Sequence, residues 1–194
     1  MRLLGIDSSQ PSGSAALLEN QSILSQKINP NPESRANPAL ALVDAVLSDA
    51  AVELKALDGF AITTGPGSFT GIRIGVATAA TLAYAARVPV TDVGSLHGRA
   101  RNAPEGTMHV LVALDARRGN VYSALFCNFE LVGEYTHGPM PAELPEGTVV
   151  LGDDAPVRPD VLARLAAASD RRTEPSELRP MYLRRSDPEE RRDL

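Results

Sequence analysis

The sequence is short of the residues that build covalent or metal-bound frameworks. Its 194 residues include one cysteine, three histidines and no tryptophan. The lone Cys127 excludes an internal disulfide framework and fits a reducing compartment. His97, His109 and His137 are too scattered for a metal site on one helix, and no pair has the spacing of a helical two-histidine centre. We therefore expect neither a disulfide scaffold nor a bound metal.

Long apolar runs and excess positive charge are also missing. The apolar run at residues 72–86 is too short, and too rich in Gly, Thr and Ala, to predict a membrane span, and no secretory signal opens the chain. The formal net charge is −5, which argues against long-range attraction of nucleic acid to this chain alone. A hydrophobic content of 43% predicts a folded protein. We expect the protein to be cytoplasmic and not to bind a membrane.

The first half of the chain reads as a mixed α/β lobe. Apolar patterning predicts strands at residues 2–7, 14–18 and 22–28, and then a helix that Asn37 would cap and that ends near residue 51. A strand at residues 59–63 and a helix at residues 72–86, with Thr70 as a candidate cap, complete this lobe.

The second half repeats the first at an offset of 108, from residue 3 to residue 111. The string Leu-Leu-Gly-Ile-Asp ending at Asp7 matches Leu-Val-Ala-Leu-Asp ending at Asp115, and the next two strands keep the offset. Two unrelated strand meanders could match in this way, but the shared terminal Asp favours duplication. A short strand at residues 148–151 and a helix at residues 159–168 indicate a reduced second copy.

Two such lobes, at residues 1–101 and 108–194 around a linker at residues 102–107, outline the actin-like ATPase fold, whose lobes resemble ribonuclease H. In that fold, turns after the strand-end Asp residues hold phosphates and help to place Mg²⁺. Here Asp7 and Ser8 precede a turn containing Pro11, and two Arg residues crowd the turn after Asp115. Gly152 stands where a Gly-Gly pair would face adenine. We favour turn-capping roles for both Asp residues and a lost nucleotide site.

One glycine-rich string lies between the strand at residues 59–63 and the helix that follows it. A phosphate loop at a helix N-terminus is a weak reading, because the string lacks the Gly-Lys-Ser/Thr ending of a Walker loop. As a family signature it is much stronger. Its members are Gly65, Pro66, Gly67, Ser68, Phe69, Thr70 and Gly71.

Both predicted helices of the first lobe are apolar nearly all round, which favours a protein partner on the outward side over a helix that is merely well buried. Small residues in the second helix would let a partner helix approach closely. The candidate interface comprises Leu40, Val43, Leu47, Ile72, Arg73, Gly75, Val76, Ala79, Ala80 and Ala83. The charged C-terminal segment contains apolar residues at 178–183, for which we favour docking on the protein's own body.

These motifs together resemble the TsaB family, also called YeaZ. The resemblance rests on Gly-Ile-Asp-Ser-Ser at residues 5–9, the glycine-rich string running on to Gly75, the segment at residues 114–122 and the Tyr-Leu-Arg ending at residues 182–184. It covers essentially the whole chain, although the second lobe looks shorter than is typical.

The resemblance implies a non-catalytic paralogue of TsaD that serves in making threonylcarbamoyladenosine on tRNAs reading codons that begin with A. It implies a heterodimer with TsaD through the first-lobe helices, and a homodimer when this chain is alone. It also implies that TsaE joins the larger complex as an ATPase and that tRNA is contacted only indirectly. No cofactor is implied beyond ATP or ADP at the junction with the partner. Two enzyme readings compete with it. A residual ATPase or kinase would use Asp7, and a protease, which we favour least, lacks a readable triad.

Overall fold

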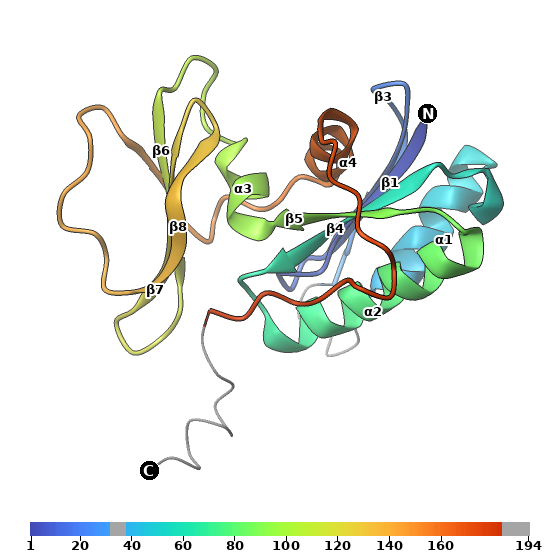
Figure 1. Cartoon of the computed structure of the whole chain (residues 1–194), viewed down its shortest axis with the longest axis horizontal. Coiled ribbons are helices and arrows are strands. Elements are labelled where there is room, and N and C mark those ends of the chain that lie inside the picture. Colours follow the sequence, from blue (N-terminus) through green and yellow to red (C-terminus); the bar gives the residue numbers. More distant parts are fainter. Residues whose placement is uncertain (32–37, 184–194) are drawn as a thin grey trace, which may run out of the picture.

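The computed structural model describes residues 1–31 and 38–183, which build two β-sheets and the helices that flank them (Figure 1). The first sheet has the strand order β3-β2-β1-β4-β5, and the second has the order β8-β7-β6-β9. The predicted cap Asn37 and the residues after 183 lie outside the described residues. The mixed α/β architecture agrees with the predicted actin-like, ribonuclease H-like fold.

The first-lobe elements follow the predicted order with small shifts. They are β1 (Arg2–Asp7), β2 (Ser14–Glu19), β3 (Ser22–Ile28), α1 (Ala39–Ala50), the 3-10 turn η1 (Leu54–Ala56), β4 (Gly59–Gly65), α2 (Phe69–Ala86), β5 (Val90–Gly94) and α3 (Ser95–Ala100). The short elements η1, β5 and α3 were not predicted, because three to six residues carry too little periodicity. The prediction of Thr70 as a cap is wrong. The helix begins at Phe69, and the Ser68 hydroxyl accepts the Gly71 N–H at 3.2 Å.

The second lobe confirms the internal repeat. Its elements are β6 (His109–Asp115), β7 (Val121–Cys127), β8 (Glu130–Gly138), β9 (Val149–Leu151) and α4 (Pro159–Ala168). In each sheet the first three strands pair as an antiparallel meander, and a fourth strand joins the first in parallel. The orders β3-β2-β1-β4 and β8-β7-β6-β9 are therefore the same arrangement built twice.

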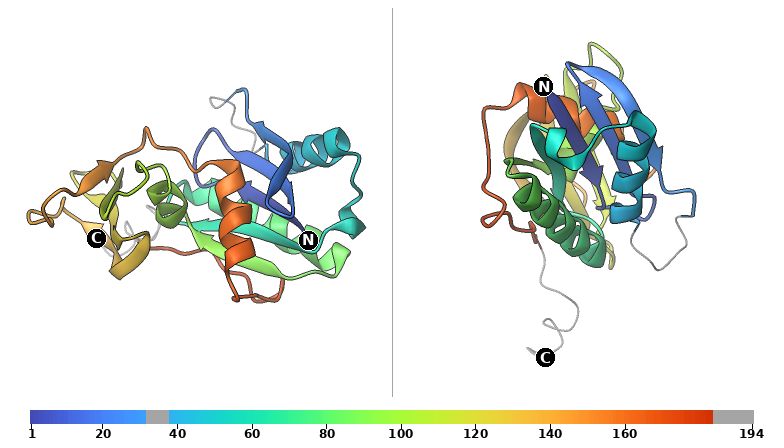
Figure 2. Two further views of the ribbon diagram at one scale, coloured as in Figure 1. Left: turned by 90° about the horizontal axis from the view of Figure 1, so that it is seen from above. Right: turned by 90° about the vertical axis from the view of Figure 1, so that its right-hand side faces the viewer.

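Each half of the chain contributes one helix to the core of the other half's sheet, an arrangement we call the helix exchange. Leu96 and Ala100 of α3 belong to the core of the second sheet, whereas Leu162 and Ala163 of α4 pack on the first. Figure 2 shows α4 over the first sheet, on the face opposite α1 and α2. Gly5 in β1 permits this contact, because a Cβ there would lie 3.0 Å from the backbone of α4.

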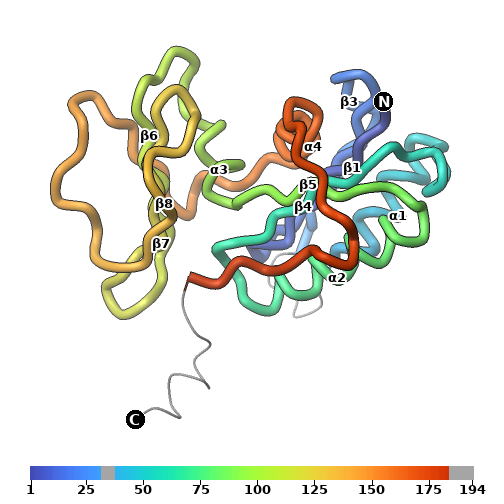
Figure 3. Tube along the Cα trace, viewed as in Figure 1, coloured from blue at the N-terminus to red at the C-terminus, as the bar shows by residue number. Residues whose placement is uncertain are grey.

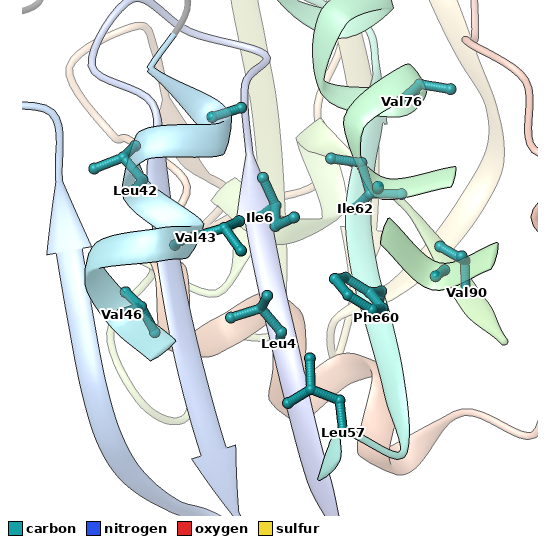
Figure 4. Close-up of a cluster of buried hydrophobic side chains, with 14 of the residues drawn as sticks. Leu4, Ile6, Leu42, Val43, Val46, Leu57, Phe60, Ile62, Val76 and Val90 are labelled. Atoms are coloured by element: carbon teal, nitrogen blue, oxygen red, sulfur yellow. The ribbon is translucent and has the colours of Figure 1, made fainter. Parts of the chain in front are cut away.

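The other face of the first sheet carries the largest core. Alternate residues of β1 and β4 point toward the helices, and Figure 4 shows Leu4, Ile6, Phe60 and Ile62 meeting side chains of α1 and α2. Starting at Phe69, α2 reaches 18 residues, so by length and composition alone it could cross a membrane, contrary to the sequence expectation. Core helices of soluble proteins share that property. Here α2 packs on a sheet through one side.

The C-terminal segment runs back along the first lobe, as Figure 3 shows in red. Thr173 pairs with Val90 at the outer edge of β5, and the Met181 N–H donates to the Thr64 carbonyl at 2.7 Å. Leu178 is buried in the core with α1 and α2. The expected docking of this segment on the protein's own body is confirmed for residues 173–183.

The helix exchange predicts that α4 stabilises the first lobe. Leu162 is fully buried, so Leu162→Ala should lower the free energy of unfolding by about 2–5 kcal/mol, as for other buried leucines. The control Val150→Ala, at a half-exposed position on β9, should change it by less than about 0.5 kcal/mol. Urea denaturation followed by circular dichroism measures both. Equal, small effects would mean that α4 packs only loosely on the sheet.

Candidate functional site

The glycine-rich string lies at the carboxyl ends of β1 and β4, against the turn that follows β1. A Cβ at Gly67 would overlap the Ser9 carbonyl, one at Gly71 the Ser8 carbonyl, and one at Gly75 the Ser8 hydroxyl. The Ser68 N–H donates to the Ser9 carbonyl at 2.8 Å. Glycine at every fourth position therefore lets the start of α2 lie directly on the β1 turn. The string is a packing device, and within it no Lys side chain is available to reach a phosphate.

Asp7 is fully buried beside that turn. Its Oδ1 accepts hydrogen bonds from the Ser9 N–H at 3.0 Å, the Ser9 hydroxyl at 2.7 Å and the Thr63 hydroxyl at 2.7 Å. Its Oδ2 has no hydrogen-bond partner among the described residues. Burial raises the pKa of Asp7, and the hydrogen bonds from Thr63 and Ser9 and the charge of Arg99 act in the opposite direction.

Asp115 occupies the equivalent position in the second lobe and makes the equivalent bond. Its Oδ1 accepts the Arg117 N–H at 2.7 Å, as Asp7 accepts the N–H of Ser9 two residues on. The Asp115 N–H donates to Asp153 at 3.0 Å, and Asp115 is exposed. Both Asp residues therefore cap turns, as the sequence favoured. The turn after β9, which begins at Gly152, approaches from the same lobe.

The residues of this cleft do not fit a bound Mg²⁺-nucleotide well. One Asp7 oxygen is saturated by internal donors, Pro11 removes a backbone donor, and Asp153 and Asp154 add negative charge next to Gly152. Within residues 1–31 and 38–183, no three His, Cys, Asp or Glu side chains gather as metal ligands would. Asp7 and Asp115 thus end the strands that the sequence associated with a nucleotide site, but the groups around them do not fit Mg²⁺ and phosphate.

The structure corrects much of the predicted interface on α1 and α2, because most of its members face the protein's own core. Gly75 packs against Ser8, and the others contact the first sheet; the buried members are Val43, Ile72, Gly75, Val76, Ala79 and Ala83. Leu47 and Ala80 are partly buried against the same core. Only Leu40 and Arg73 of the predicted set are exposed. In an Ala-rich helix the apolar pattern does not distinguish the inward face from the outward face.

The outward face of the two helices is nevertheless apolar, through the predicted Leu40 and through residues that were not predicted. Leu40 on α1 and Ile74 and Tyr84 on α2 are 60%, 40% and 78% exposed. Two small residues of the same helices, Ala41 and Ala77, are also exposed. The views in Figures 1 and 2 place α1 and α2 side by side under one face of the sheet. We call the exposed surface of these five residues the α1–α2 face.

Arg73 borders this face but is held by the C-terminal segment. Its Nε donates to the Tyr182 hydroxyl at 2.7 Å, and its guanidinium lies 4.0 Å from the centre of the Phe69 ring. The Phe69 and Tyr182 rings are themselves 5.0 Å apart. The cluster fastens residues 173–183 to the beginning of α2.

Comparison with known proteins agrees with this architecture. A family model described as TsaD, tRNA N6-adenosine threonylcarbamoyltransferase, matches residues 19–179. TsaB of Bacillus subtilis, a tRNA threonylcarbamoyladenosine biosynthesis protein, is 31% identical over 153 residues, covering 79% of this chain. YeaZ from Pseudomonas aeruginosa superimposes with a TM-score of 0.79 at 27% identity, covering 93% of this chain and 100% of that chain. The chain belongs to the TsaB/YeaZ family.

Other relatives show how far the likeness extends. TsaB of Escherichia coli is 36% identical over 126 residues, and an uncharacterised protein of Mycobacterium tuberculosis is 31% identical over 95% of this chain. The chain spans 64% of the B. subtilis TsaB and 54% of the E. coli TsaB. A second P. aeruginosa structure, described by its similarity to the peptidase YeaZ, has a TM-score of 0.81 at 29% identity, over 94% of this chain and 99% of that chain.

The glycine contact predicts a specific rescue. Gly75→Ala should lower the free energy of unfolding by about 1–3 kcal/mol, because the new methyl group overlaps Ser8. Adding Ser8→Gly should recover most of that loss, because it removes the Ser8 side chain with which the new methyl group clashes. Chemical denaturation of the two single variants and the double variant measures the coupling. If the effects of the two substitutions simply add, the contact between Gly75 and Ser8 does not determine how closely α2 packs on the β1 turn.

The raised pKa of Asp7 predicts a pH dependence of stability. The unfolded carboxyl ionises near its ordinary pKa of 3.8 and the folded one at higher pH, so the folded state loses stability as pH rises through that window. Asp7→Asn lacks this loss and keeps an oxygen for Thr63 and Ser9. Its stability relative to the parent should therefore increase as the pH rises above about 4. Urea titrations at stepped pH test this, and a gap that shrinks instead would indicate a carboxylate stabilised as the ion.

Proposed function

We propose that this chain is a non-catalytic scaffold and activator that pairs with a TsaD-type transferase in the threonylcarbamoylation of tRNA adenosine. The observation that carries the proposal is the α1–α2 face, on which Leu40, Ile74 and Tyr84 expose apolar side chains around small residues. Apolar surface gathered on two neighbouring helices is typical of a protein interface. Ala41 and Ala77 would allow a partner helix to approach closely.

The family relationship supports TsaD as the partner. This chain matches the TsaD family model over residues 19–179, which include α1 and α2, so a TsaD is expected to carry a related helix pair. Two paralogues can then meet through equivalent faces, in the manner of a symmetric dimer. The same surface would pair two copies of this chain when TsaD is absent.

Charge and site chemistry support an auxiliary role. The net charge of −5 gives this chain no general attraction for tRNA, so the tRNA would be held by the partner. TsaE would join the larger complex as its ATPase, and any ATP or ADP would lie at the junction with TsaD. We place the protein in the cytoplasm. The negative charges of Asp153 and Asp154 next to Gly152 give the competing ATPase reading little support, because they would repel a triphosphate.

Light scattering on a sizing column, with and without the TsaD of the same organism, tests the proposal. The parent should form a peak of heterodimer mass. Ile74→Asp should weaken pairing by about 30-fold or more, because it places a carboxylate in the apolar centre of the face. Val132→Asp on β8 is the matched control, since Val132 is 48% exposed on the other lobe, and it should pair like the parent.

Circular dichroism must first show that both variants are folded. Undiminished pairing by folded Ile74→Asp would overturn the assignment of the face, and no pairing by the parent at micromolar concentration would overturn the scaffold itself. Saturable binding of Mg²⁺-ATP by the isolated chain in calorimetry, lost in Asp7→Asn, would support the ATPase reading in its place.

A further inference from the structure

One cation lies buried between the lobes, outside the features used above. Arg99 is on α3, the helix that the first half of the chain contributes to the second sheet, and its side chain is 3% exposed. Sequence reasoning did not single it out. An unpaired buried guanidinium is costly, so its partners define what it does.

The partners of Arg99 come from both lobes. Nη1 donates to the Ala155 carbonyl at 2.7 Å and lies 3.5 Å from the carbonyls of Gly152 and Asp153, in the turn after β9. Nη2 donates to Oε1 of Gln10 at 2.8 Å, in the turn after β1. One planar group therefore bonds the Asp7 turn of the first lobe to the loop after the last strand of the second.

Gln10 reinforces the same junction. Its amide oxygen receives Arg99, and its amide nitrogen donates to the Val157 carbonyl at 3.5 Å. Val157 follows the turn at residues 152–155 and is buried against the first sheet. The segment between β9 and α4 is therefore held by Arg99 at the Ala155 carbonyl and by Gln10 at the Val157 carbonyl.

Acidic groups offset part of the cost of burying Arg99. Desolvation by burial lowers the pKa of Arg99, while the charges of Asp7, Asp153 and Asp154 act in the opposite direction. The guanidinium therefore joins the two lobes through both its hydrogen bonds and its charge.

We propose that Arg99 is a built-in latch that holds the two lobes in one relative arrangement without a bound ligand. The contacts of the guanidinium with Gln10 and with the carbonyls of residues 152–155 carry the proposal. The latch belongs to the isolated chain and does not depend on pairing with TsaD.

Hydrogen exchange of the full chain, measured by mass spectrometry, tests the latch. Arg99→Met keeps the length of the side chain and removes the charge and donors, so exchange in residues 8–13 and 152–157 should become about tenfold faster or more. Arg101→Met is the matched control. Arg101 lies two residues on and stacks over Phe129 of the second lobe at 4.7 Å, so its loss should leave both peptides unchanged.

Two further measurements keep the test decisive. Gln10→Ala removes the first-lobe acceptor and should accelerate exchange in the 152–157 peptide even if Arg99→Met fails to fold. Spin labels on Cys127 of β7 and on Lys55→Cys of η1 should give one narrow distance distribution for the parent, unchanged by Mg²⁺-ATP, and a broader one for Arg99→Met. Parent-like exchange in both Arg99→Met and Gln10→Ala, or a nucleotide-dependent distance in the parent, would overturn the latch.

Discussion

The approach of α2 to the turn after β1 is the contact on which the first lobe depends. Gly67, Gly71 and Gly75 present no side chains to Ser8 and Ser9, so the helix lies directly on the ends of β1 and β4. This contact fixes the rotation of α2 about its own axis. Ile72 and Val76 then point into the core, and Ile74 and Tyr84 must point away from it. The family motif thus sets the outward face, although it contributes only Ile74 to it.

The duplication explains why two Asp residues persist as turn caps while their environments differ. Asp7 and Asp115 each accept the N–H two residues on, at the end of the first strand of the same meander. The first copy is enclosed by α2 and the glycine string, whereas the second is exposed. Burial raises the pKa of Asp7, whereas its counterpart is an exposed turn cap.

The sequence predicted strands and the internal repeat well, because alternating apolar residues and a constant offset of 108 survive in the pattern. It could not predict the exchange of α3 and α4, since binary patterns show that a helix needs cover but not which sheet provides it. The interface residues were misplaced for a related reason. Ile72 and Ile74 have equal hydropathy, and only the packing of Gly75 on Ser8 decides which of the two is buried. The segment at residues 95–100 gave no clear signal for Arg99, because the partners of Arg99 lie far away in sequence.

A latched cleft and an apolar helix face suit a subunit that works by presenting a fixed surface. Binding costs less when the surface is already in its bound geometry, and α1 and α2 are held in one arrangement by their packing on the first sheet. The guanidinium of Arg99 bonds backbone carbonyls and the neutral Gln10, so the closure has no ligand concentration to respond to. Any nucleotide dependence in an assembled complex would then have to originate in the partner subunits, because a ligand shifts an equilibrium only where it distinguishes two states.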